Sequence, residues 1–157
     1  MAYIYFSKQE KTNLRESPVS MIMNTEINLK SRNVSPLPIT RRSNTMLGVG
    51  DKIPEFQVVG AKAGFTQHEQ NGESAFADIT QDSFEGKWKV LFFWPKDFTF
   101  VCPTEIVEYG NLNAEFDDRD AVLLGCSTDN EFCHLAWRRE HKDLTDSPFM
   151  WLSDTNG

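Results

Sequence analysis

The sequence predicts an α/β fold in which a largely parallel sheet is covered by helices in three layers. From Met46 onward, apolar runs short enough for strands alternate with longer segments of helical periodicity. Hydrophobic residues make up 39% of the 157 residues, which is typical of a soluble globular protein of one domain. No uninterrupted apolar run approaches the ~20 residues that a membrane-spanning helix requires, so we expect no membrane association.

The first two predicted strands differ in how deeply they should be buried. Residues 56–59 follow Pro54 and indicate a short strand, and a turn-like segment with glycines extends from there to Gly72. The run at 88–94 is nearly all apolar and stops at Pro95. A strand that is apolar on both faces belongs in the middle of a sheet that helices cover.

The rest of the chain alternates between helix and strand. Residues 102–116 carry apolar side chains at helical spacing with carboxylates and amides between them, which predicts an amphipathic helix. Residues 121–127 indicate a second buried strand, 130–142 a second helix and 149–152 a third strand. Strands joined by helices in this way pair in parallel through crossover connections. Because the chain stops soon after the third strand, we expect the domain to be incomplete at its C-terminus.

Charge divides the chain near Met46. Residues 1–46 carry a net charge of +4, and residues 47–157 carry −11. Residues 1–45 lack sustained periodicity and contain three prolines among polar residues, which predicts a mostly disordered basic extension. This extension is either an organelle-targeting peptide, although its three glutamates depart from that pattern, or a segment without function. Residues 46–157 form the predicted domain, which lacks a basic cluster, so we expect no nucleic-acid binding.

The residues with reactive chemistry follow the strand at 88–94. Cys102 stands at the first turn of the predicted helix, and Pro103 comes where the N–H that proline lacks is not needed. Glu105, three residues after Cys102, has the spacing of a capping box. Free N–H groups and partial positive charge at a helix start favour a thiolate over a thiol. Thr99 can turn its hydroxyl toward the sulfur and toward a substrate oxygen, so we predict a nucleophilic site here.

The other two cysteines are predicted to be bystanders. Cys126 lies on a predicted buried strand, where a free cysteine serves core packing. Cys133 is followed by His134 on a helix, where adjacent side chains point to different faces, so a joint role is not expected. Three cysteines without a Cys-x-x-Cys spacing argue against a disulfide framework and a four-ligand zinc site. We expect reduced thiols in the cytoplasm, with no metal and no other cofactor.

The segment FFWPKDFTFVCPTE, residues 92–105, resembles the active site of the peroxiredoxins of the AhpC/TSA family, of the typical two-cysteine type. STDNEFCHLAW at 127–137 and PFMWLSD at 148–154 extend the resemblance, which covers residues 46–157. It implies a thioredoxin fold and a thiol-dependent peroxidase that reduces hydrogen peroxide and alkyl hydroperoxides. It further implies a part in antioxidant defence and cell redox homeostasis.

Carried over residue by residue, the resemblance implies a role for each motif position. Cys102 would be the peroxidatic nucleophile that becomes a sulfenic acid, and Thr99 would orient the peroxide. Pro95 would shield the sulfenate from water, and Glu105 would help to hold an active-site arginine. The resemblance also implies a thiol reductant, such as a thioredoxin or a dedicated disulfide reductase, and a homo-oligomer for the full-length protein.

Three hypotheses stay open from the sequence. The first is a peroxide-reducing enzyme. The second is a non-catalytic fragment, since the family's active-site arginine and resolving cysteine would both lie beyond this chain, and Arg138 and Arg139 do not fit the arginine's place. The third is a thioredoxin-like disulfide reductase, which the lack of a Cys-x-x-Cys spacing disfavours.

Overall fold

The computed structural model describes residues 4–8, as a strand, and residues 53–156. All of them belong to one compact unit, which is built from residues 1–11 and 52–157. A second unit, residues 12–51, lies outside the described residues, as do residues 1–3, 9–11, 52 and 157.

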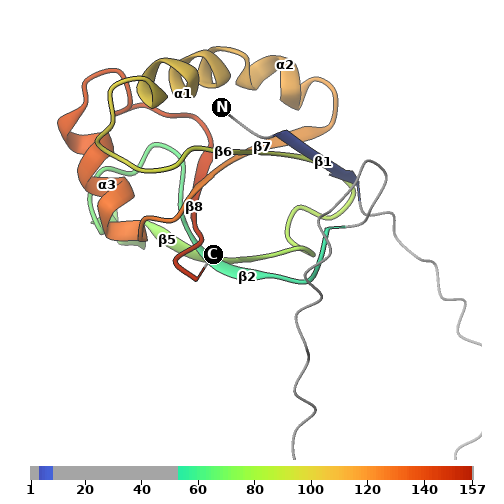
Figure 1. The fold of residues 1–157 in the computed structure, drawn as a ribbon. Coiled ribbons are helices and arrows are strands. Elements are labelled where there is room, and N and C mark those ends of the chain that lie inside the picture. Colours follow the sequence, from blue (N-terminus) through green and yellow to red (C-terminus); the bar gives the residue numbers. More distant parts are fainter. Residues whose placement is uncertain (1–3, 9–52, 157) are drawn as a thin grey trace, which may run out of the picture. The chain divides into compact units, whose positions relative to one another are not determined.

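A mixed sheet of six strands forms the centre of the described unit (Figure 1). In spatial order its strands are β1 (Ile4–Lys8), β6 (Trp88–Phe93), β7 (Ala121–Ser127), β8 (Met150–Ser153), β2 (Gln57–Ala61) and β5 (Phe76–Thr80). The pairs β6–β7 and β7–β8 are parallel, as predicted, while the pairs of β1 with β6, β2 with β8 and β2 with β5 are antiparallel. The largely parallel sheet that the sequence predicts is therefore found only in its centre.

The strands near the sheet's other edge were only partly expected. β2 begins close to the predicted strand at 56–59 and runs on to Ala61. β5 was not predicted, because residues 76–80 follow a polar, glycine-containing stretch and are only half-buried as a whole. A short hairpin of β3 (Glu69–Gln70) and β4 (Glu73–Ser74) interrupts the segment that the sequence marks as turns. Short strands of this kind lack the apolar run that identifies β6 and β7.

Strand β1 lies in the segment for which we expected disorder. Its backbone pairs antiparallel with β6, with Ile4 opposite Phe92 and Lys8 opposite Trp88. An edge strand presents a row of unpaired N–H and C=O groups that a further strand can satisfy, which explains how a segment of weak periodicity joins the sheet. Residues 4–8 thus depart from the expected division at Met46, and the rest of the predicted extension lies outside the described residues.

Three described helices accompany the sheet: α1 (Cys102–Asn111), α2 (Asn113–Asp117) and α3 (Glu131–Glu140). The single helix predicted for 102–116 is therefore divided at Leu112, whose N–H is shared between the carbonyl oxygens of Glu108 and Tyr109. Such shared bonds are common where a helix ends. Among the described residues, no helix has the length and apolar character that would let it cross a membrane.

Both crossovers place their helices on one face of the sheet. The chain moves from β6 to β7 to β8 in one direction, and right-handed connections in one direction lie on the same side. Residues of α1 and α3, such as Ile106 and Leu135, pack there in one apolar cluster with Phe92 and Trp151. The other face carries a second cluster around Leu91, Leu124, Cys126 and Leu152, to which no described helix contributes. The second helical layer of the predicted three-layer fold is therefore not among the described residues.

Candidate active site

The loop between β6 and α1, together with the first turn of α1, carries the candidate residues of the predicted site. It leaves the sheet at the same edge as the connection from β7 to α3, because the carboxyl ends of parallel strands meet at one edge. The backbone N–H of Trp94 still donates to the carbonyl of Cys126 at 3.0 Å, so the loop starts from a fixed point beside β7.

Cys102 is the first residue of α1, and its side chain is 8% exposed. The helix is preceded by Val101 as its N-cap, a residue without a polar side chain, so no side-chain oxygen caps this end. The capping box expected between Cys102 and Glu105 is therefore not formed, because the helix starts one position earlier than that spacing assumes. The helix dipole still favours negative charge at this end, although Pro103 has no N–H and the N–H of Thr104 donates to the Val101 carbonyl at 3.2 Å.

Beside the loop lies a cavity of about 360 Å³. It is lined by Phe98, Thr99, Phe100, Pro103, Trp137, Glu140 and His141. The Thr99 hydroxyl donates to the carbonyl of Lys96 at 3.1 Å, which leaves its lone pairs for another donor. Phe98 is 50% exposed and Phe100 99% exposed, so the cavity has an apolar rim. It can admit a small molecule that carries one polar end.

Pro95 and Glu105 lie at the two ends of the motif and do not line this cavity. Pro95 is exposed, and its carbonyl accepts a hydrogen bond from the Thr128 hydroxyl at 3.3 Å. Glu105 is half-buried on α1. The pKa of Tyr109 on the same helix is raised, first by the burial of Tyr109 and second by the charge of Glu105. The structure thus places Thr99 and Pro103 at the cavity, whereas Cys102, Pro95 and Glu105 are not among the residues that line it.

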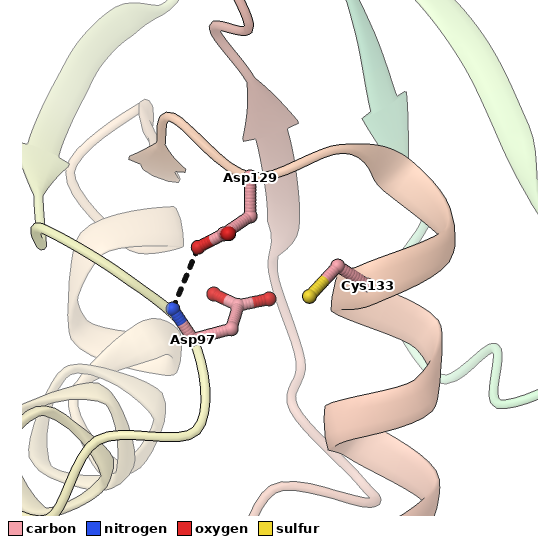
Figure 2. A group of neighbouring side chains, drawn as sticks. All are labelled: Asp97, Asp129 and Cys133. Carbon is pink, nitrogen blue, oxygen red and sulfur yellow. Dashed lines mark hydrogen bonds between the residues drawn. The ribbon is translucent and has the colours of Figure 1, made fainter.

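Asp97 was not predicted as a site residue, yet it makes several hydrogen bonds that fix the loop. Its side chain is only 1% exposed. Trp94 Nε1 donates to Asp97 Oδ1 at 2.7 Å, and His134 Nδ1 lies 2.6 Å from Asp97 Oδ2. The backbone N–H of Asp97 donates to Asp129 Oδ2, also at 2.7 Å (Figure 2). These bonds join the loop to the end of β6, to α3 and to the connection that precedes α3.

His134 is completely buried and faces an oxygen acceptor at each ring nitrogen. Besides the contact with Asp97, its Nε2 lies 3.1 Å from the carbonyl oxygen of Leu152. A carbonyl can only accept, so Nε2 carries a proton, and a second proton lies between Nδ1 and the Asp97 carboxylate. The two side chains, 0% and 1% exposed, form a buried hydrogen-bonded pair.

Cys133 also faces this carboxylate, as Figure 2 shows. Burial first, then the charges of Asp97 and Asp129 and a hydrogen bond to Asp97, raise the pKa of the Cys133 thiol to about 11. Ligand atoms of Asp97, Asp129 and Cys133 lie within 4.8 Å of one another, a spacing that a metal site also shows. Here, however, the Cys133 thiol is protonated and donates a hydrogen bond, and the carboxylates accept hydrogen bonds. A metal ion would require a deprotonated thiol, so these three residues are better suited to hold the loop through hydrogen bonds.

Cys126 has the surroundings that the sequence predicts for a core residue. It is buried in the second apolar cluster. Burial, followed by the charge of Asp154, raises the pKa of its thiol to about 12. A thiol held so firmly in its protonated form is a poor nucleophile at neutral pH.

A signal for Asp97 and Asp129 was present in the sequence. Asp97 stands two residues before Thr99, after the predicted strand 88–94, and Asp129 follows the strand 121–127. Polar residues just after adjacent parallel strands meet at one edge of the sheet.

The fold and this site together define a class of protein. A cysteine begins the helix that follows β6, the first of three parallel strands joined by helices, which makes the chain a thiol protein of the thioredoxin fold. A model of the AhpC/TSA family matches residues 49–157, and the chain belongs to that family.

Relatives of this chain include several alkyl hydroperoxide reductases. Alkyl hydroperoxide reductase C of Mycolicibacterium smegmatis is 49% identical over 112 residues, which are 69% of this chain and 57% of that protein. The solved structure of Mycobacterium tuberculosis AhpC superimposes with a TM-score of 0.64 at 48% identity and covers 70% of this chain and 63% of that one. A 2-Cys peroxiredoxin of Plasmodium vivax gives a TM-score of 0.58 at 32% identity, with 68% and 53% covered. The chain thus spans little more than half the length of the curated relatives it matches.

Proposed function

We propose that this chain carries out the peroxide-reducing step of a thiol-dependent peroxidase, acting on hydrogen peroxide and alkyl hydroperoxides. One observation carries the proposal: Cys102 occupies the first position of α1, directly before Pro103, which lines a cavity together with Thr99. The family membership supports the same function. The reacting form of a cysteine nucleophile is the thiolate.

The proposed reaction needs no cofactor. The Cys102 thiolate attacks the terminal oxygen of the peroxide, an S–O bond forms and the O–O bond breaks. The leaving oxygen takes up a proton and departs as water or an alcohol, and Cys102 becomes a sulfenic acid. The sulfur is oxidised by two electrons, which the peroxide accepts.

Five neighbours of Cys102 in the sequence have proposed roles in this step. Thr99 accepts a hydrogen bond from the hydroperoxide, which its bond to the Lys96 carbonyl leaves it free to do. Pro95 restricts the entry of water to the oxidised sulfur, and the exposed rings of Phe98 and Phe100 form an apolar collar around the substrate. Glu105 helps to hold the active-site arginine that the family resemblance implies.

The partners follow from the same chemistry. A first reductant thiol attacks the sulfenic acid and releases water, and a second thiol reduces the resulting mixed disulfide, which returns Cys102 to its starting state. We propose a thioredoxin or a dedicated disulfide reductase in this part, and a homo-oligomer as the assembled protein. Three free thiols, at Cys102, Cys126 and Cys133, suit the reducing cytoplasm.

Stopped-flow consumption of hydrogen peroxide tests this proposal. The purified chain, with dithiothreitol as reductant, should consume peroxide, and Cys102→Ser should lose this reaction at least ~100-fold, because an alcohol at this place is not ionised at neutral pH. Cys133→Ser is the matched control and should retain the rate, since its thiol is protonated.

Trapping by dimedone, read by mass spectrometry, should place the sulfenic acid on the peptide that contains Cys102. Equal rates for the unchanged chain and Cys102→Ser would refute the proposal and leave the non-catalytic hypothesis in its place.

A further inference from the structure

The active-site loop is held mainly at one buried residue. Asp97 is buried, whereas its neighbours Lys96 and Phe98 are exposed. Its carboxylate receives hydrogen bonds from Trp94 at the end of β6 and from His134 and Cys133 on α3. A fixed side chain in the middle of an otherwise exposed loop sets the position of the residues on either side of it.

The backbone closes around this anchor. The Thr99 hydroxyl bonds back to the carbonyl of Lys96, so the turn from 96 to 99 encloses Asp97. Phe98 has a φ of +57°, in the left-handed region that a residue with a Cβ rarely adopts, and its ring lies 5.9 Å from that of Trp137. Such a conformation persists only where the surrounding contacts hold it in place.

The buried pair of Asp97 and His134 opposes any movement of the loop away from this position. If the Asp97 carboxylate moved away, the ring of His134 would keep a buried N–H without an acceptor, and Trp94 Nε1 would lose its partner. A second bond, from the Asp97 N–H to Asp129, fixes the backbone itself. The orientation of Thr99 therefore depends on the contacts of a residue that does not itself line the cavity.

We propose that Asp97, supported by His134 and Asp129, is a positioning residue that holds Thr99 in the orientation needed for the reaction of Cys102 with peroxide. Asp97 does not line the cavity and acts through Thr99. This inference rests on the proposed peroxidase function. In this view Asp97, Asp129 and Cys133 form a hydrogen-bonded cluster that fixes the position of the loop.

The test compares two reactions of the same sulfur. Hydrogen peroxide requires Thr99, whereas alkylation by iodoacetamide requires only an accessible thiolate. In Asp97→Ala, the rate of sulfenic acid formation should fall about 10- to 100-fold while alkylation of Cys102 changes less than about threefold, because small displacements strongly impair an oriented reaction. Mass spectrometry of the Cys102 peptide separates its alkylation from that of the other two cysteines.

Two further variants show whether Asp97 acts through Thr99. Asp97→Asn should retain most of the rate, because the amide oxygen still accepts from Trp94 and its NH₂ can donate to Nδ1 of a neutral His134. The double variant with Asp97→Ala and Thr99→Val should be no slower than Thr99→Val alone, since coupled residues are not additive. Additive losses, or equal losses in the peroxide and alkylation reactions, would overturn the proposal.

Hydrogen exchange gives a readout that does not depend on peroxidase activity. Asp97→Ala should raise the exchange of amides 96–101 relative to those of α1, and Asp97→Asn should not. If the chain does not react with peroxide but shows this exchange pattern, the proposed function is refuted and the role of Asp97 in fixing the loop is retained. Unchanged exchange in Asp97→Ala would refute that role. If Asp97→Ala fails to unfold cooperatively, Asp129→Ala replaces it, since that change removes the acceptor of the Asp97 N–H and leaves the buried pair intact.

Discussion

Position in the fold gives the three thiols of this chain different chemistry. Cys102 stands at a helix start, Cys133 donates to a carboxylate, and Cys126 is enclosed by the second apolar cluster. The surroundings of Cys133 and Cys126 raise the pKa of their thiols and keep them protonated at neutral pH. The same residue type therefore serves as candidate nucleophile, hydrogen-bond donor and core filler.

The raised pKa of Cys126, about 12, predicts a loss of stability in alkaline solution. Above about pH 9 the thiol ionises in the unfolded chain but stays protonated in the folded one, so the unfolded chain binds fewer protons. The free energy of unfolding should then fall by about 1.4 kcal/mol per pH unit for this group as the pH rises toward 12. Urea unfolding at a series of pH values between 8 and 11 measures the slope.

Cys126→Ala provides the control for this prediction. Its absolute stability differs from that of the parent chain because of the smaller side chain, so only the pH dependence is compared. The slope should become shallower but not vanish, because Cys133, with a pKa of about 11, contributes in the same direction. An unchanged slope would contradict the assignment of the alkaline loss to Cys126.

At the scale of elements, the order of strands and the hand of the connections decide where the site lies. β6 and β7 end at the same edge of the sheet, and α1 and α3 start there. Cys102 is the first residue of α1, and Asn130 is the N-cap of α3. The two helix starts carry the two halves of the site: the reactive sulfur on one, and the groups that hold the loop on the other.

The N-cap of α3 is the basis of a stability prediction. Asn130 Oδ1 accepts from the backbone N–H of Cys133 at 2.9 Å, and its backbone is extended as a cap requires. Asn130→Ala should lower the free energy of unfolding by about 1 kcal/mol, because one N–H of the first turn loses its acceptor. Urea unfolding measures this loss. Asn130→Asp should restore most of the stability, and a loss as large as that of the alanine variant would contradict the capping role.

At the scale of the whole molecule, the outer edge of β6 is covered by a strand from outside the matched family region. β1 comprises residues 4–8, whereas the AhpC/TSA model begins at residue 49. Without β1, the N–H and C=O groups along the free side of a mostly buried strand would be left unpaired.

Removal of residues 1–8 should therefore increase self-association. Exposed edges pair with one another, so the truncated chain should show larger species that grow with concentration. Sedimentation velocity of the full and truncated chains at matched concentrations measures this change. Deletion of residues 20–27, which has the same length and leaves the strand in place, is the control. Identical distributions for all three chains would show that β1 does not protect this edge.

Much of the centre of this fold could be predicted from its local sequence. The prediction for residues 121–127 is confirmed, since β7 has these bounds, and β6 and β8 fall where apolar runs were found. The prediction of Cys102 in the first turn of a helix is confirmed as well. Strand β5, the break at Leu112 and strand β1 were not predicted, because a half-buried strand, a helix end and an edge pairing leave little periodicity.

What the sequence determined by itself is the local chemistry: buried strands, helix starts, and a cysteine and threonine at fixed spacing between them. Those features depend on residues a few positions apart. The tertiary structure alone decided that Asp97 meets His134, 37 positions away, and that residues 4–8 complete the sheet beside β6. Such contacts depend on strand order and crossover hand, which place the ends of separate elements at one edge and are not encoded in any single segment.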